Sequence, residues 1–221
     1  GVMSFEAALR LVAVRGRLMQ GLPAGAMLSV SLPESELAPW LGSELSVAAI
    51  NSPGRSVISG PEVAIAAVEE QLTAQSVACR RLHTSHAFHS QMMDPILAPF
   101  LAELEKVELK APQLPFLSNS SGTWISESEA TDPGYWVRHL RGTVRFADNL
   151  SALFEKQGGI LLEVGPGKTL ATFARQHAAK PEKVVILSNR EPYIHMHNDG
   201  RVEVQRPASG RSPLSSVIKS T

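Results

Sequence analysis

The sequence Ser85-His86-Ala87-Phe88-His89-Ser90 stands between two different hydrophobic patterns. Before it, residues 26–83 alternate short β runs with helical stretches. After it, apolar residues from Met92 onward recur at spacings of three and four, which predicts a helix. Together with His83, the stretch places three imidazoles at intervals of three residues. It is therefore a candidate functional site as well as a structural boundary.

The pattern before this stretch predicts a small subdomain. We expect its strands and helices, in chain order, at residues 26–31 (strand), 33–41 (helix), 45–51 and 55–59 (strands), 60–72 (helix) and 77–83 (strand). In the second helix, Ile65, Val68 and Leu72 recur at spacings of three and four. This βαββαβ order is typical of a ferredoxin-like subdomain, which we place at residues 24–84. Asn51-Ser52-Pro53-Gly54 is predicted to form the turn between the two middle strands.

The rest of the chain predicts an α/β fold. Ser4 precedes apolar residues at helical spacing and is the expected N-cap of a first helix. Later elements are expected at residues 92–104 (helix), 114–118 (strand), 146–154 (helix), 160–164 (buried strand) and from about 168 (helix). The last strand and helix, joined by Gly165-Pro166-Gly167, form half of a parallel α/β unit. Beyond residue 187, a hairpin is predicted around Asn198-Asp199-Gly200, and polar residues 206–221 are expected to be disordered.

Composition excludes several classes of protein. The 221 residues carry 21 Lys plus Arg and 21 Asp plus Glu, so no net field attracts nucleic acid or an anionic membrane, and no local basic patch stands out. No apolar run approaches the roughly 18–20 residues of a membrane span. The single cysteine, Cys79, excludes an internal disulfide and a cysteine-rich zinc site and fits a reducing, cytoplasmic setting.

The three histidines have more than one reading from the residues alone. On an extended segment, His83 and His89 would share one face and His86 the other, which would split a metal site. No Glu, Asp or Cys lies adjacent to complete a ligand set. A histidine before a helix can instead be a general base, but the Gly-x-Ser-x-Gly turn that would present a serine is absent. By spacing alone, His89 is as much a structural residue as a catalytic one.

The stretch from Ser85 to Ser90 resembles a fingerprint of the acyltransferase domains of type I polyketide synthases, relatives of malonyl-CoA:acyl-carrier-protein transacylase. Five more segments match that family in order and approximate spacing: residues 11–20, 51–54, 135–141, 144–146 and 163–167. The resemblance covers residues 1–187. It implies an α/β-hydrolase-like core interrupted by a ferredoxin-like subdomain, in agreement with the pattern of residues 26–83.

The resemblance implies ping-pong acyl transfer, in which a serine takes malonate from malonyl-CoA and passes it to the phosphopantetheine thiol of an acyl carrier protein. No cofactor and no metal are implied. His89 matches the catalytic histidine, with a backbone carbonyl near His139 holding its other ring nitrogen. The family commonly has an amide at position 139. Arg15 matches the arginine that pairs with the free carboxylate of the malonyl group.

Three further residues are implied to shape the substrate site. His86 and Phe88 match the positions that separate malonyl from methylmalonyl selection, and the bulky pair is associated with malonyl. Asn51 is implied to approach the site from the small subdomain, although a role in the turn explains it equally well.

The matching family carries its nucleophile in a Gly-His-Ser-x-Gly turn, which this sequence lacks. We therefore expect a fragment that depends on the missing N-terminal part of the acyltransferase and on neighbouring synthase domains, and that is inactive alone with uncovered apolar faces. The alternatives are a non-catalytic remnant or interaction module, and an ester hydrolase, which would not need Arg15. Residues 185–194 and 206–210 resemble the start of a trehalose-phosphate-synthase-type glycosyltransferase, so residues 188–221 are expected to be an unrelated tail.

Overall fold

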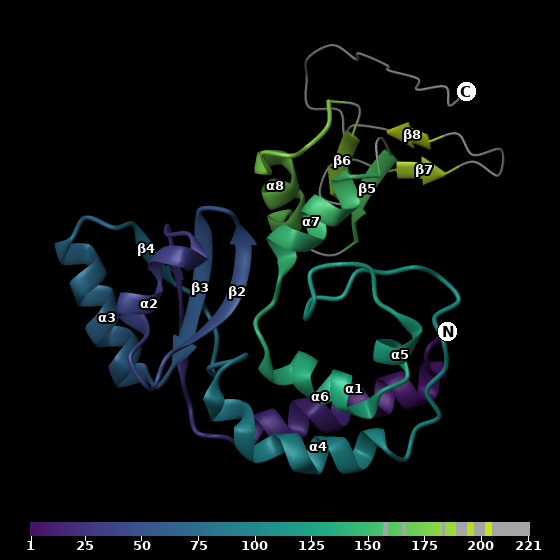
Figure 1. Ribbon diagram of the computed structural model, residues 1–221, viewed down its shortest axis with the longest axis horizontal. Coiled ribbons are helices and arrows are strands. Elements are labelled where there is room, and N and C mark those ends of the chain that lie inside the picture. Colours follow the sequence, from purple (N-terminus) through teal and green to yellow (C-terminus); the bar gives the residue numbers. More distant parts are fainter. Residues whose placement is uncertain (157–158, 165–166, 183, 189–193, 197–201, 205–221) are drawn as a thin grey trace. The chain divides into compact units, whose positions relative to one another are not determined.

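The computed structural model describes residues 1–156, 159–164, 167–182, 184–188, 194–196 and 202–204 (Figure 1). Helices and strands are mixed along the chain, as expected for an α/β protein. The chain divides into two compact units, Gly1–Leu153 and Phe154–Thr221.

The first unit contains a four-stranded antiparallel sheet in the order β2-β3-β1-β4. Its elements, in chain order, are β1 (Ala26–Val30), the 3-10 helix η1 (Glu34–Glu36), α2 (Ala38–Leu41), β2 (Ser46–Ser52), β3 (Arg55–Gly60), α3 (Glu62–Ala74) and β4 (Cys79–Arg81). The predicted order of strands and helices over residues 26–83 is therefore present, and β2 lies at an edge of the sheet.

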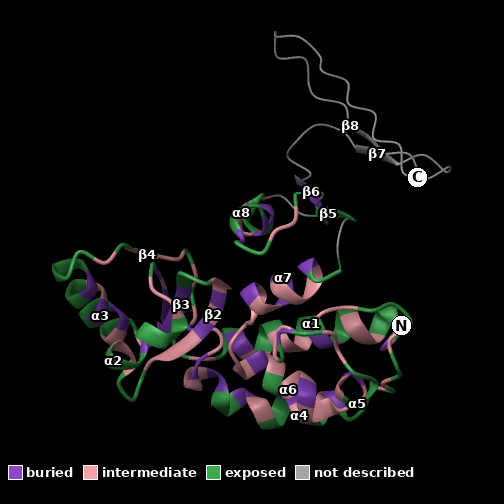
Figure 2. Ribbon diagram, turned by 45° about the horizontal axis from the view of Figure 1, so that its top comes forward, coloured by how far each residue is buried: buried purple, intermediate pink, exposed green. Residues whose placement is uncertain are grey.

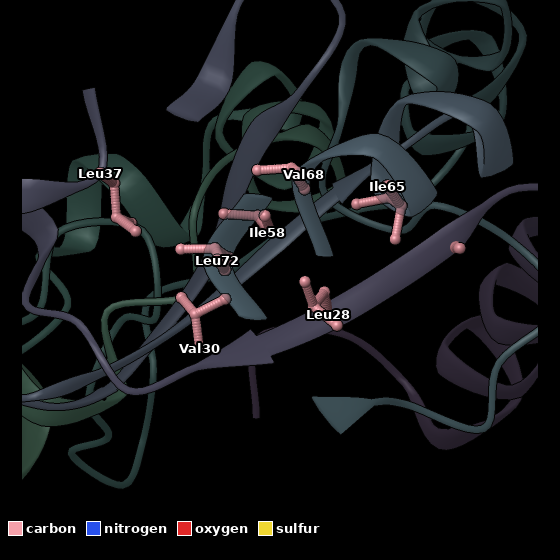
Figure 3. Close-up of a cluster of buried hydrophobic side chains, with 8 residues drawn as sticks. Leu28, Val30, Leu37, Ile58, Ile65, Val68 and Leu72 are labelled. Carbon is pink, nitrogen blue, oxygen red and sulfur yellow. The ribbon is translucent and has the colours of Figure 1, made fainter. Parts of the chain in front are cut away.

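Helix α3 packs on the sheet and closes its core (Figure 3). The helix contributes Ile65, Val68 and Leu72, whose spacing brings them onto one face. They meet Leu28 and Ile58 from the two central strands, and all five side chains are almost fully buried. Burial of a side chain of this size stabilises the fold by roughly 1.5–3 kcal/mol.

Three predicted boundaries in this region were wrong. The helix expected at residues 33–41 is split into η1 and α2, with Pro39 in the first turn of α2, where its missing N–H is tolerated. The last strand stops at Arg81 instead of His83. Asn51 and Ser52 are the last residues of β2, so only Pro53 and Gly54 form the turn.

The remainder of the first unit is mainly helical. Its elements are α1 (Phe5–Gln20), the 3-10 helix η2 (Gln91–Ile96), α4 (Leu97–Leu104), α5 (Glu127–Ala130) and α6 (Pro133–Arg141). A shared core contains Leu11, Met93, Phe100 and Leu140. Ser4 caps α1 as predicted, because its hydroxyl accepts a hydrogen bond from the Ala7 N–H at 3.1 Å.

Two further features of this unit concern its surface and loops. Helix α1 carries buried and exposed residues around its axis (Figure 2), and Phe5, Leu9 and Val12 are 72%, 54% and 68% exposed. The predicted strand at residues 114–118 is absent, since that segment forms only an isolated bridge between Leu117 and Trp124. Pro115 lacks the N–H that a ladder requires.

The second unit contains a parallel pair of strands. Its elements are β5 (Gly159–Glu163), α8 (Thr169–Gln176), β6 (Val184–Ser188), β7 (Ile194–Met196) and β8 (Val202–Val204), after α7 (Phe146–Phe154), which begins in the first unit. Strands β5 and β6 are parallel neighbours, with α8 between them in sequence.

Burial of β5 was predicted wrongly. Ile160 and Leu162 are 48% and 43% exposed, because β5 belongs to a sheet of just two described strands.

Strands β7 and β8 are antiparallel and flank the predicted turn Asn198-Asp199-Gly200. That turn and residues 206–221 lie outside the described residues. Over the described part of the chain, no helix is long and apolar enough to cross a membrane.

Candidate active site

The loop that carries the three histidines is turned and bent, not extended as the sequence suggested. It follows β4 and ends where Ser90 begins η2. The buried Ser90 hydroxyl donates to the Ala87 carbonyl at 2.7 Å and accepts from the Met92 N–H at 3.2 Å. This capping fixes the residue immediately before it, His89.

The His89 ring is held in one tautomer by a backbone carbonyl. Its Nδ1 lies 2.8 Å from the carbonyl oxygen of Gly142, the C-cap residue of α6. A carbonyl only accepts, so Nδ1 carries the proton and Nε2 of the neutral ring keeps its lone pair. The carbonyl expected near His139 is thus present, three residues further along the chain.

The surroundings keep His89 neutral. Burial, the largest influence, lowers the pKa of His89 to about 4, and the positive charge of Arg15 acts in the same direction, whereas the hydrogen bond to Gly142 opposes the shift. At neutral pH the imidazole is therefore unprotonated. A ring with a free Nε2 lone pair is the form that a general base requires.

Arg15 lies close enough to His89 and His139 for its charge to act on both rings. Burial, the larger effect, and the charge of Arg15 both lower the pKa of His139. The charge of Arg15 also adds to the effect of burial on the pKa of His89. The Arg15 side chain itself is half-buried, and burial lowers its pKa. Within the described residues, none forms an ion pair or hydrogen bond with this guanidinium. A half-buried arginine without a partner favours an anionic ligand.

His139 comes to this site from α6. Its ring stands beside those of Tyr135 and Trp136, with centroid distances of 6.3 and 6.2 Å. The site therefore joins a helix residue from α1, a loop residue before η2 and a helix residue from α6, positions far apart in sequence.

His86 and Phe88 lie beside one another, with ring centroids 6.1 Å apart. His86 Nε2 donates to the Leu22 carbonyl at 3.2 Å, and Nδ1 accepts from the Ser85 hydroxyl at 2.8 Å. Phe88 packs against both the helical core and a small cluster on the sheet that includes Met27. Across the described part of the chain, no group of three or more His, Cys, Asp and Glu side chains could hold a metal ion.

Asn51 lies in an irregular part of β2. The pairing of β2 with β3 shifts between Ile50 and Ser52, so Asn51 is an extra residue in the ladder. Such bulges redirect side chains and occur often beside active sites. No described contact places the Asn51 side chain against His89 or Arg15.

Residues 142–145, which we call the anchor segment, were not predicted as part of the site. Val144 bridges β2 in parallel at Ala49, with its N–H donating to Ala48 and its carbonyl accepting from Ile50, both at 2.9 Å. The segment thus connects the sheet to the carbonyl that holds His89. The role of Gly142 lies in its backbone carbonyl, which the sequence does not distinguish from any other. Residues 144–146, by contrast, were among the segments that matched the family.

A histidine held in one tautomer, near an arginine without a partner among the described residues, is an arrangement that a protein transferring or cleaving acyl groups can use. The Acyl transferase domain family matches residues 1–192, and the chain belongs to this family. Its relatives include a phenolphthiocerol/phthiocerol polyketide synthase of Mycobacterium tuberculosis, 38% identical over 177 residues that cover 80% of this chain and 12% of that protein. Mycoketide-CoA synthase of the same species is 44% identical over 75% of this chain and 4% of its own length.

Solved structures agree with the family. The acyltransferase domain of SpnD, solved in complex with 2-(pent-4-yn-1-yl)malonyl, is 40% identical and superposes with a TM-score of 0.79 over 85% of this chain and 46% of that chain. The sequence thus spans less than half of that acyltransferase and a small fraction of the curated synthases. The resemblance of the tail to a glycosyltransferase stays a prediction.

Proposed function

We propose that this chain supplies the histidine and the arginine of an acyltransferase site that moves a malonyl group from CoA to the phosphopantetheine thiol of an acyl carrier protein. The observation that carries the proposal is the neutral His89, with Nδ1 fixed by Gly142 and Nε2 free, in the electrostatic field of the unpaired Arg15. A base and an anion site close together suit a substrate that is both a thioester and a carboxylate.

In this proposal His89 Nε2 takes the proton of a serine as the serine oxygen attacks the thioester carbonyl. The carbon–sulfur bond then breaks, and the proton passes from His89 to the departing CoA sulfur. His89 next deprotonates the phosphopantetheine thiol, which attacks the acyl-serine, and the proton returns to the serine oxygen. The carbonyl of Gly142 keeps the ring in the required tautomer throughout and stabilises the transient imidazolium.

The serine is proposed to lie outside this sequence. No Gly-x-Ser-x-Gly motif occurs in the chain, and the SpnD acyltransferase is about twice as long as the part matched here. We assign the nucleophile to the Gly-His-Ser-x-Gly turn of the family, in the part of the domain that precedes α1. Neighbouring synthase domains and the carrier protein complete the assembly.

Arg15 is proposed to hold the free carboxylate of malonate. A planar guanidinium can donate two parallel hydrogen bonds to a carboxylate, which a lysine cannot. The substituted malonyl group bound to the SpnD domain, at 40% identity, supports a dicarboxylic acyl substrate. The charge of Arg15 also acts on His139, so the His139 ring would lie beside the same carboxylate.

Phe88 and His86 are proposed to favour malonyl over methylmalonyl. Phe88 is wedged between two apolar clusters and His86 is hydrogen-bonded at both ring nitrogens, so neither ring can easily retreat from an α-methyl group. A steric difference of this kind is worth about 1–3 kcal/mol. Asn51, in its bulge, is proposed to border the site from the sheet.

The finer architecture is also a proposal. The strand order β2-β3-β1-β4, with η1 and α2 between β1 and β2 and with α3 between β3 and β4, supports a ferredoxin-like subdomain at residues 24–84 within an α/β-hydrolase-like core. We propose an acyltransferase part at residues 1–187, an unrelated tail at 188–221 whose first five residues still fall within the family match, and a cytoplasmic setting for a CoA-dependent protein.

The test is malonyl transfer by an acyltransferase domain that contains both this chain and the Gly-His-Ser-x-Gly turn, with labelled malonyl-CoA and a carrier protein. His89→Ala should lower the rate by about 10²–10⁴-fold, whereas the exposed His83→Ala should not. The isolated chain should form no covalent malonyl adduct. Full activity of His89→Ala would refute the role of His89, and a stable adduct on the isolated chain would refute a nucleophile outside it.

A further inference from the structure

The anchor segment links His89 to the edge strand of the sheet. Gly142 accepts the His89 hydrogen bond at 2.8 Å, and the next residue, Thr143, donates its hydroxyl to the Val47 carbonyl at 2.7 Å. Val144 then joins the bulged part of β2 through two backbone hydrogen bonds. A displacement of this segment would therefore move the acceptor that fixes the His89 tautomer.

Arg145 holds the end of the anchor segment from several directions. Its Nη1 donates to both carboxylate oxygens of Glu34, in η1, at 2.8 and 2.9 Å. Its Nε donates to Asp148, in α7, at 2.6 Å. Its backbone N–H donates to the Asn119 carbonyl at 2.8 Å. Arg145 thus connects the anchor segment to η1, to α7 and to the loop that contains Asn119.

One partner of Arg145, Asp148, belongs to a helix that packs against the loop of Asn119. Gly122 has φ +73°, and a Cβ built on it would lie 2.6 Å from the Cβ of Asp148, so this loop lies directly against the helix. On the next residue of α7, the Asn149 amide donates to the Asn119 side-chain oxygen at 2.7 Å. The loop therefore holds the first turn of α7, from which Asp148 reaches Arg145.

From these contacts we propose that Arg145 is a positioning residue of the acyltransferase site, which acts on His89 through the carbonyl of Gly142. The catalytic consequence rests on the proposed function, whereas the placement of His89 by Arg145 rests on the contacts alone. A purely stabilising ion pair at a partly exposed position contributes up to about 1 kcal/mol and would leave His89 unchanged.

Arg81 provides a matched control. It also lies between two carboxylates, those of Glu62 and Glu69, and its side chain is 34% exposed against 30% for Arg145. It belongs to β4, at the opposite edge of the sheet from β2, and makes no described contact with the anchor segment. Removing either guanidinium should cost similar stability.

The direct test is nitrogen NMR of this chain with labelled histidine, in which the Nδ1 and Nε2 shifts report the tautomer of His89. Arg145→Ala should give a mixture of tautomers and faster solvent exchange of the Nδ1 proton, and Arg81→Ala should give the wild-type pattern. Glu34→Gln is a milder change that serves as the test if Arg145→Ala folds poorly. It should shift the His89 nitrogen signals in the same direction. Wild-type His89 signals in folded Arg145→Ala and Glu34→Gln, or equal changes in Arg81→Ala, would overturn the proposal.

The kinetic test uses the complete acyltransferase domain. Arg145→Ala should lower kcat for malonyl transfer by about 10-fold or more, with KM for malonyl-CoA changed by less than about 2-fold, as expected for a displaced catalytic group. Arg81→Ala should leave both constants unchanged. If the wild-type domain transfers no malonyl group, the proposed function is wrong. The NMR comparison of the His89 tautomer in wild type and Arg145→Ala still tests whether Arg145 positions His89.

Discussion

Among single residues, His89 has an unusual backbone for its type. Its φ is +58°, in the left-handed region that residues other than glycine seldom adopt. Such a conformation costs on the order of 1 kcal/mol and persists where the surroundings enforce it. Here the Ser90 cap on one side and the carbonyl of Gly142 on the other enforce it. The strained backbone presents a ring with a defined tautomer.

The lowered pKa of His89 predicts how stability depends on pH. The unfolded chain protonates this ring near its ordinary pKa of 6.5, whereas the folded chain keeps it neutral down to about 4. Between these values the unfolded state binds more protons, so stability present above pH 6.5 is lost as the pH falls toward 4. The loss should reach at most about 3 kcal/mol.

Urea unfolding at pH 7.5 and pH 5 measures this dependence. His89→Gln should reduce the drop in unfolding free energy between the two pH values, while the exposed His83→Gln should not. Part of the drop should remain in His89→Gln, since burial also lowers the pKa of His139. An identical drop in His89→Gln and the wild type would show that His89 is not held neutral by the fold.

The sequence indicated the side chains of the site better than its backbone. Arg15, His89 and His139 were singled out by motif, and in the structure the charge of Arg15 acts on both imidazole rings. A backbone carbonyl near His139 was expected to hold the His89 ring, but the residue that carries it, Gly142, was not identified, because every residue has a carbonyl and only the fold selects one. The roles of Asn51, His86 and Phe88 stay predictions.

At the scale of helices and strands, local signals worked where one residue type has one strong preference. Ser4 was predicted as an N-cap and accepts the expected hydrogen bond, and the period of Ile65, Val68 and Leu72 identified the buried face of α3. Residues 114–118 misled because a short apolar run resembles a strand whether or not a partner pairs with it. Burial of β5 failed because it depends on neighbours in space.

The cap of α1 yields an element-scale prediction. Ser4→Ala removes the hydroxyl that accepts from Ala7 and should lower the unfolding free energy by about 1 kcal/mol. Ser35→Ala, at an exposed position of η1, should change it by less than about 0.5 kcal/mol. Chemical denaturation of the two variants provides the comparison. Equal effects would mean that the Ser4 hydrogen bond contributes nothing to the helix.

At the scale of the whole molecule, α1 leaves an apolar stripe open on the first unit. Phe5, Leu9 and Val12 lie at spacings of four and three on one face, and each is more than half exposed. Contiguous apolar surface of this kind promotes association with other apolar surfaces. Val63, 82% exposed, is the one large apolar side chain of α3 that is exposed, and it offers a control.

Replacing the stripe should reduce association without weakening the fold. The double variant Leu9→Gln and Val12→Gln should bind less of the apolar dye ANS and scatter less light at high concentration, with a Tm close to wild type. Val63→Gln should alter neither signal. Unchanged dye binding in the double variant would show that the stripe does not form a continuous apolar surface in solution.

The selectivity of Arg15 variants tests the central claim most directly, because the account requires His89 and Arg15 to act on one acyl group. In the complete acyltransferase domain, Arg15→Ala should lower malonyl transfer by about 10–100-fold, the cost of a lost charged hydrogen bond, and leave acetyl transfer within about 3-fold. Arg17→Ala, exposed on the same helix, should leave the ratio of the two rates unchanged. Equal losses of malonyl and acetyl transfer in Arg15→Ala would contradict the account.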